Sequence, residues 1–310
     1  MRSSRHATLA WLAVLAAINV ALFALVAYVA IGTIRGQMLD TVALSGNWVG
    51  QAAFGSALNS ALNAVSVASL VLVLLVVGWI ALLRERYSLA IMAVVLVAGS
   101  TLTTYVLKTY LITRTDLGVD PERATAGNSL PSGHATAAAA FAVGLVLVLP
   151  PAARGLASII GATYAAVVGV ATLSAGWHRP SDVIASYLIV GGWAAGAGLL
   201  LILAQRPSAV VSSRDRAGWS LATTLLGGVG LLAGGALALV ITFNRMTEPV
   251  GRMSSQWHTL GYFGSAMAIA GAAYLMMAVV LSTVHQVVPH SKDGRLNEDW
   301  VGAVAAGSPR

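Results

Sequence analysis

Cysteine is absent from the 310-residue chain, and charged residues make up only 9% of it. The lack of cysteine excludes disulfide bonds, thiol catalysis and zinc–thiolate sites. Soluble globular domains carry about 25% charged residues, so a water-facing globular surface is excluded too. Disorder is also excluded, because disordered chains are poor in apolar residues and 57% of this chain is hydrophobic. No basic cluster interleaved with aromatics occurs, so we expect no nucleic-acid partner despite the net charge of +7.

Long apolar runs dominate the sequence. A helix of about 20 apolar residues crosses a bilayer, and eight stretches reach or approach this length. They are residues 8–34, 62–83, 87–107, 134–150, 155–175, 181–204, 218–243 and 260–285. The sequence therefore predicts an all-α, polytopic transmembrane helix bundle of about eight spans, with the membrane bilayer as its surroundings.

The basic residues predict how this bundle is oriented. With the N-terminus in the cytoplasm, eleven Lys and Arg residues fall on the cytoplasmic side and seven on the outer side. Cytoplasmic loops of membrane proteins carry the excess of Lys and Arg. We therefore expect a multi-pass protein of the cell membrane with both termini in the cytoplasm.

Three polar clusters interrupt the apolar pattern. The first runs from Lys108 to Arg114, the second is Pro131-Ser-Gly-His134, and the third runs from Gly176 to Asp182. With eight alternating spans, all three clusters fall on the outer face of the membrane. We therefore expect an extracytoplasmic site.

The residue types in these clusters suit phosphate chemistry. Lys108 and Arg114 offer positive charge and hydrogen-bond donors to a phosphate. Ser132 and Gly133 open a helix, whose first N–H groups favour an anion. An aspartate that accepts from one imidazole nitrogen improves the other nitrogen as a nucleophile, and His178 lies four residues before Asp182. Together with His134, these residues predict a phosphoryl-transfer site that needs neither a metal nor a cofactor.

In order, spacing and topology, the three clusters resemble the signature motifs of the type 2 phosphatidic acid phosphatases, the PAP2 superfamily. The resemblance implies that His178 attacks phosphorus and forms a phosphohistidine, that Asp182 orients it, and that His134 protonates the leaving alkoxide. It also implies that the phosphate is held by Lys108, Arg114, Ser132 and Gly133.

The sequence departs from the family pattern in two places. Five residues rather than six separate Lys108 from Arg114, and Thr115 follows where the family usually has proline. The family's third motif also has an arginine six residues before the nucleophilic histidine, where this chain has Thr172. Arg179 and Arg123 are the nearest candidates to replace that phosphate-binding arginine.

The resemblance implies a lipid phosphatase whose substrate is a lipid phosphomonoester or diphosphate, such as phosphatidic acid, phosphatidylglycerol phosphate or a polyprenyl diphosphate. Two alternatives stay open. A membrane phosphotransferase would use the same site with another acceptor, and a non-catalytic lipid-binding or transport protein would use only the scaffold.

The resemblance in span layout also suggests how the chain is divided. We expect a six-helix PAP2-like core over residues 1–204, two additional transmembrane helices over 205–285, and a cytoplasmic tail over 286–310. Two GxxxG spacings, at Gly192–Gly196 and Gly230–Gly234, fit close packing within one bundle or a helix dimer. A homo-oligomer therefore stays open.

Overall fold

The computed structural model describes residues 2–53, 60, 62, 75–76, 78–79, 87–119, 128–204 and 218–288. Within these residues the fold is a bundle of long helices without strands, which confirms the predicted class. The helices are α1 (Arg2–Gly32), α2 (Ile34–Ser45), α5 (Tyr87–Val106), α7 (Gly133–Val148), α8 (Pro151–Ser174), α9 (Pro180–Ala204), α10 (Gly218–Asn244) and α11 (Ser255–Val287). A π-helical turn, η1 (Leu107–Leu111), extends α5, and a 3₁₀ turn, η2 (Val250–Arg252), precedes α11.

Among the residues that the structure describes, six helical segments are long and apolar enough to cross a membrane. They are Arg5–Gly32, Ser88–Leu111, Pro151–Ser174, Pro180–Ala204, Gly218–Asn244 and Ser255–Val287, and the shorter apolar helix α7 runs beside them. Each corresponds to a predicted span, with ends that differ by a few residues. The remaining predicted span, 62–83, lies almost entirely outside the described residues. The chain is thus a multi-pass helical protein.

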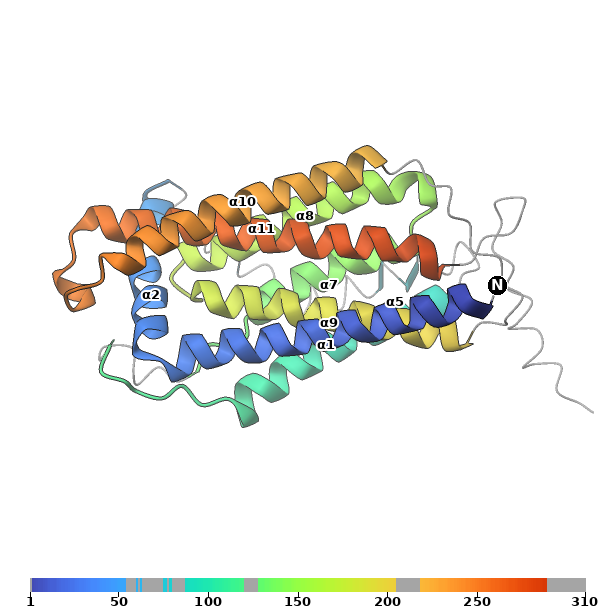
Figure 1. The fold of residues 1–310 in the computed structure, drawn as a ribbon, viewed down its shortest axis with the longest axis horizontal. Helices are drawn as coiled ribbons and strands as arrows, with labels where there is room; N and C mark the ends of the chain where they lie inside the picture. The colour runs from blue at the N-terminus through green and yellow to red at the C-terminus, as the bar shows by residue number, and fades with distance from the viewer. Residues whose placement is uncertain are drawn as a thin grey trace, which may run out of the picture.

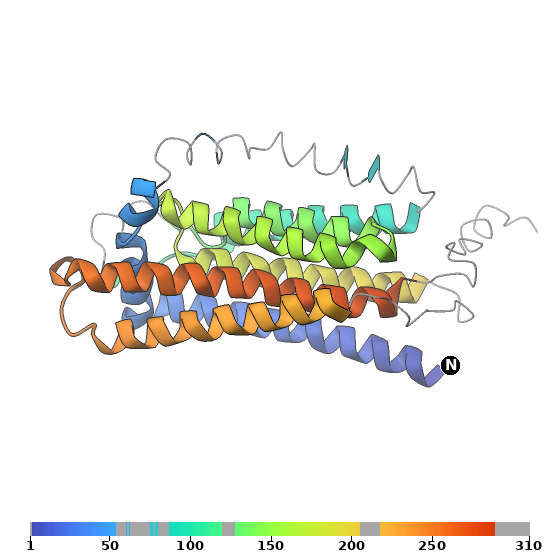
Figure 2. The same ribbon diagram turned by 90° about the horizontal axis from the view of Figure 1, so that it is seen from above.

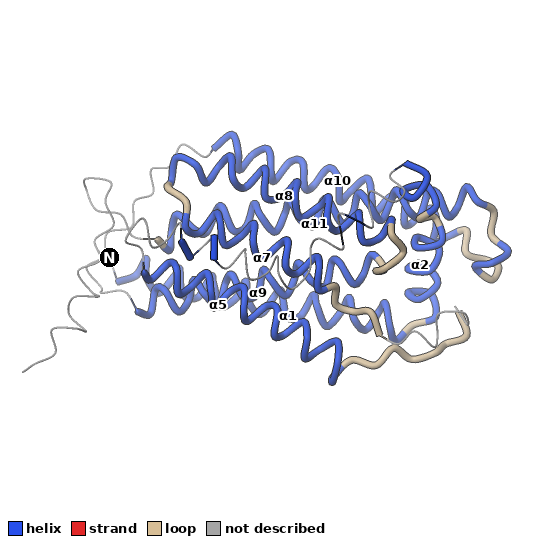
Figure 3. The backbone as a smooth tube through the Cα atoms, turned by 180° about the vertical axis from the view of Figure 1, so that it is seen from behind, coloured by secondary structure: helices blue, strands red, loops and turns tan. Residues whose placement is uncertain are grey.

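The spans run side by side along the long axis of the molecule (Figure 1). Helix α2 differs from them, because it lies across one end of the bundle, opposite the N-terminus. We call this end the α2 end. The loops that precede α7 and α9 also lie there (Figure 3). From α5 to α11, successive spans alternate in direction (Figure 1), so the chain segments that carry the three polar clusters meet at this end.

Helices α10 and α11 form a tight pair that runs the length of the bundle (Figure 2). Small residues allow their backbones to approach closely, as is typical of membrane helices. A Cβ added at Gly235 of α10 would lie 2.7 Å from both the amide nitrogen of Ala268 and the carbonyl oxygen of Gly264 on α11. Only glycine fits at such a contact, which joins the two C-terminal helices into one unit.

An apolar groove of about 350 Å³ lies between α1, α9, α10 and α11. The polar side chains in its lining form hydrogen bonds with backbone carbonyl oxygens: Asn19 donates to Leu15, Thr283 to Val279 and Tyr187 to Ala165. The lining of the groove is therefore mainly apolar.

Candidate active site

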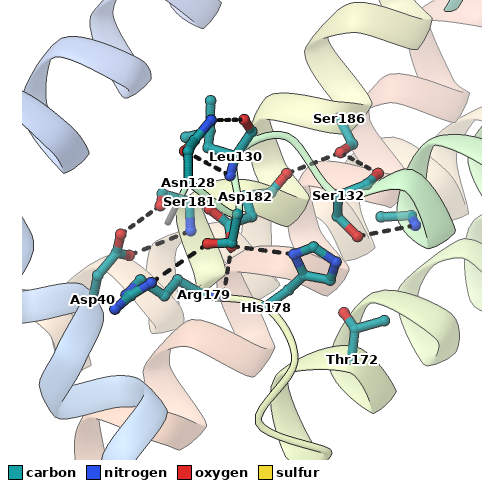
Figure 4. A network of polar contacts seen from close by, with 12 residues as sticks. Asp40, Asn128, Leu130, Ser132, Thr172, His178, Arg179, Ser181, Asp182 and Ser186 are labelled. Carbon is teal, nitrogen blue, oxygen red and sulfur yellow. Dashed lines mark hydrogen bonds and ion pairs between the residues drawn. The ribbon is translucent and has the colours of Figure 1, made fainter. Parts of the chain in front are cut away.

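The second and third polar clusters meet at the first turns of α7 and α9. The amide of Ser132 donates to the carbonyl oxygen of Asp182 over 3.1 Å. The hydroxyl of Ser186, one turn further along α9, contacts the carbonyl oxygens of Ser132 and Asp182 at 2.8 and 2.9 Å. These bonds hold the start of α7 against the start of α9 (Figure 4).

Ser132 begins α7 as its N-cap residue. Its backbone is extended, and its hydroxyl oxygen accepts from the amide of Ala135 over 3.3 Å, which is the usual bond of a serine cap. Gly133 follows and is exposed, and a Cβ added there would meet no described atom within 4 Å. The first turn of α7 therefore presents its backbone to open space, where an anion has room to approach.

A short loop between α8 and α9 shapes the surroundings of His178. Gly176 has a φ of 76°, a left-handed conformation that glycine adopts without strain. The amides of Trp177 and His178 then turn back and donate to the carbonyl oxygen of Thr172, over 3.0 and 3.2 Å. Pro180 begins α9, as predicted from its fixed φ.

His178 and Asp182 form a buried pair. The Nδ1 atom of His178 lies 3.2 Å from Oδ2 of Asp182, and the same carboxylate oxygen accepts from the amide of Arg179 over 2.8 Å. His178 is 6% exposed and Asp182 is fully buried. A neutral imidazole that donates from Nδ1 has its lone pair on Nε2, so this geometry can make Nε2 a nucleophile.

His134 lies beside the same loop, as the predicted convergence requires. Its ring centroid is 5.4 Å from that of Trp177, the residue before His178. It also lies within electrostatic range of both His178 and Lys108. The structure thus brings the two imidazoles and the lysine to one place at the α2 end.

Lys108 lies in the π-helical turn η1, where the amide of Ile112 donates to the carbonyl oxygen of Leu107 over 2.8 Å. Such wide turns occur mostly as single turns in α-helices and often at functional sites. Here the turn ends α5, and the chain continues in a segment without regular secondary structure that carries Arg114.

Two predicted phosphate-binding arginines also reach the α2 end. Arg179 is 6% exposed, and its Nη1 donates to the hydroxyl of Ser129 over 3.4 Å. Arg114 and Arg179 both lie within electrostatic range of Asp40. Arg123, the other predicted replacement for the family arginine, lies outside the described residues.

Thr172 stands where the family pattern has an arginine. It is fully buried, and its hydroxyl donates to the carbonyl oxygen of Gly169 over 2.8 Å. Its backbone carbonyl supports the His178 loop, as described above. Thr172 thus contributes to the loop through its backbone.

The structure adds two residues that the sequence analysis missed. Asp40 and Gln37 lie on α2, a helix that was not predicted, and both are buried. Asp40 accepts from the amide of Ser181 over 3.3 Å and from its hydroxyl. Burial, together with the nearby charge of Asp182, raises the pKa of Asp40 to about 6. Thr33 and Gly46 flank the helix as capping residues and were the available signal.

Among the residues that the structure describes, no three His, Asp or Glu side chains gather as a possible metal-ligand set. The arrangement offers instead two imidazoles, a buried carboxylate, cationic side chains and an open helix N-terminus. These are groups that bind and transfer a phosphoryl group.

Comparison with known proteins identifies the family. The model of the PAP2 superfamily matches residues 89–207. Over these residues the chain belongs to the PAP2 superfamily. No curated protein and no solved structure matches the chain. The matched segment includes all three polar clusters, whereas α1, α2, α10 and α11 lie outside it. The match agrees with the family that the three motifs resemble.

Proposed function

We propose that the protein is an integral-membrane lipid phosphatase that hydrolyses a lipid phosphomonoester or diphosphate through a phosphohistidine. The observation that carries this proposal is the meeting of His134, His178 and Lys108 at one end of the bundle, with Asp182 bonded to Nδ1 of His178. The match to the PAP2 superfamily supports the same chemistry.

In the first step, Nε2 of His178 attacks phosphorus and the bond from phosphorus to the leaving oxygen breaks. His134 gives its proton to that oxygen, so the product leaves as an alcohol or, from a diphosphate, as a monophosphate. Asp182 accepts a hydrogen bond from Nδ1 throughout and stabilises the positive charge that develops on the ring.

In the second step, water attacks the phosphohistidine and its P–N bond breaks. His134 now accepts the proton of the water molecule, and inorganic phosphate leaves. Lys108, Arg114, Arg179 and the first N–H groups of α7 hold the phosphoryl oxygens. The loss of one such donor costs about 10²–10³ in turnover at comparable oxyanion sites.

The substrate classes follow from the setting of the site. The site lies at one end of apolar spans, so a phosphate head reaches it while the hydrocarbon tail stays in the bilayer. Phosphatidic acid, phosphatidylglycerol phosphate and a polyprenyl diphosphate share this plan. The excess of Lys and Arg in the sequence segments expected on the cytoplasmic side supports cytoplasmic termini and an extracytoplasmic site.

The test is phosphate release by the purified protein from these three lipids, in wild type and in His178→Ala. A labelled substrate should also transfer phosphate to the wild-type protein through a bond that is stable in base and lost in acid. His178→Ala should abolish both signals. His6→Ala is the matched control, because His6 is exposed and lies near the start of α1, at the end of the bundle opposite the site.

The products separate the remaining alternatives. Labelled phosphate on a second acceptor, with little free phosphate, would replace the hydrolase by a phosphotransferase. Full turnover by folded His178→Ala would refute the phosphohistidine mechanism. Absence of both turnover and labelling in the folded wild type would favour a non-catalytic lipid-binding protein.

A further inference from the structure

Helix α2 contacts the chain beside two of the three site motifs. The Nε2 atom of Gln37 donates to the carbonyl oxygen of Thr115 over 2.7 Å, directly after Arg114. One turn further along α2, the carboxylate of Asp40 accepts from the amide and hydroxyl of Ser181, directly before Asp182. The same face of α2 therefore joins the first motif to the third (Figure 4 shows the Asp40 contacts).

The contact from Asp40 acts at the start of α9. Ser181 is the second residue of that helix, and the first four N–H groups of a helix lack partners within it. A carboxylate stabilises this end of a helix by accepting from such groups and by opposing the helix dipole. Asp40 thus fixes the turn that carries Asp182, and it also lies within electrostatic range of Arg114 and Arg179.

The C-terminal helices hold α2 in place. Val42 of α2 packs against Met246 and Val250, which follow α10. The guanidinium of Arg35 lies 5.0 Å from the ring centroid of Phe243 on α10. A Cβ added at Gly261 of α11 would lie 3.1 Å from Cγ1 of Val42. Contacts therefore run continuously from α10 and α11 through α2 to the site.

We propose that α2 is a positioning element of the site, in which Gln37 and Asp40 hold the first and third motifs in register, and that α10 and α11 keep α2 against the site. This inference rests on the proposed function, because that function defines which residues form the site. It gives a role to three helices that lie outside the matched segment 89–207. None of these residues touches the reacting atoms, so they act through Arg114 and Asp182.

The test compares folded variants by kcat/KM on a water-soluble aryl phosphate and by the affinity for orthovanadate, an analogue of the phosphoryl group in transfer. Asp40→Ala removes both contacts to Ser181 and should weaken both quantities at least tenfold. Asp40→Asn keeps an acceptor for the Ser181 amide and should recover most of the loss. Gln37→Glu has the same shape without the donor and should also lose about tenfold.

Ser45→Ala is the matched control on α2, because Ser45 is exposed at the end of that helix and should leave both quantities unchanged. Thermal unfolding of every variant shows that the protein measured is folded. Values for Asp40→Ala and Gln37→Glu within twofold of wild type would overturn the positioning role. An equal loss in Asp40→Asn and Asp40→Ala would overturn the part assigned to the hydrogen bonds.

A second pair of variants tests the C-terminal helices. Gly261→Ala and Gly261→Leu push progressively on Val42 and should reduce kcat/KM in that order, whereas Gly251→Ala meets no described atom within 4 Å and should not. Unchanged kcat/KM in folded Gly261→Leu would contradict the support from α11. Vanadate affinity tests the positioning role of α2 even if His178→Ala keeps full turnover. Failure of the positioning role can therefore be told apart from failure of the phosphohistidine mechanism.

Discussion

The buried carboxylate of Asp40 should give the protein a specific dependence of stability on pH. Asp40 is 7% exposed, and its pKa is raised from 3.8 to about 6, mainly by burial and then by the charge of Asp182. The hydrogen bond from Ser181 and the charges of Arg114 and Arg179 oppose the rise but do not cancel it. The charged form of Asp40 is therefore less favourable in the native state than in the unfolded chain.

The sign of the effect follows from which state binds the proton first. As the pH falls from about 7 to about 4, the native protein protonates Asp40 before the unfolded chain does, so this group raises the free energy of unfolding. A rise from 3.8 to about 6 corresponds to about 3 kcal/mol. Asp40→Asn resembles the protonated form at every pH. It should therefore be more stable than wild type at pH 8, by up to about 3 kcal/mol, and should match wild type near pH 4.

The assay is the unfolding of wild type and Asp40→Asn in one detergent, measured in parallel from pH 4 to pH 8. Other titrating groups contribute almost equally to both proteins, so the difference between the two curves isolates Asp40. Ser45→Ala should follow wild type at every pH. A difference between Asp40→Asn and wild type that stays constant from pH 4 to pH 8 would refute the raised pKa and the burial that causes it.

Two further predictions concern the loop between α8 and α9. Asp182→Asn keeps an acceptor for the Arg179 amide but loses the charge beside His178, so turnover should fall by about 10²–10⁴-fold; steady-state phosphate release measures this, and turnover within threefold of wild type would contradict the role of the pair. Thr172→Arg restores the family residue at a fully buried position. It should destabilise the protein by about 1–3 kcal/mol or more and should not raise kcat/KM, as measured by thermal unfolding and phosphate release. Unchanged stability together with a higher kcat/KM would contradict this prediction.

The spans and the motif residues could be predicted from the sequence because each has a local signal. An apolar run of about 20 residues has few alternatives to a membrane helix. The alternation of such runs then places their ends, so the meeting of His134 with the His178 loop followed from topology. Ser132 as a cap and Pro180 as a first helical residue are equally local.

Helix α2 could not be predicted in the same way. It has only 12 residues, too few for a span, and its buried face includes Gln37, Asp40 and Thr41. A hydropathy pattern detects helices that bury apolar faces, whereas half of the buried residues of this helix are polar. Which residues face Asp40 depends on how distant segments pack, and no local pattern contains that information.

The replacement of the family arginine by Thr172 changes where the phosphate-binding cation comes from. The Thr172 carbonyl accepts from the amides of Trp177 and His178, so the loop is held by the backbone at this position. In the proposed mechanism Arg179 supplies the cation instead, and its own amide is bonded to Asp182. The phosphate-binding charge is then attached to the same short loop as the nucleophile. Because Asp40 faces this loop from α2, a displacement of α2 should affect the nucleophile and the phosphate-binding cation together.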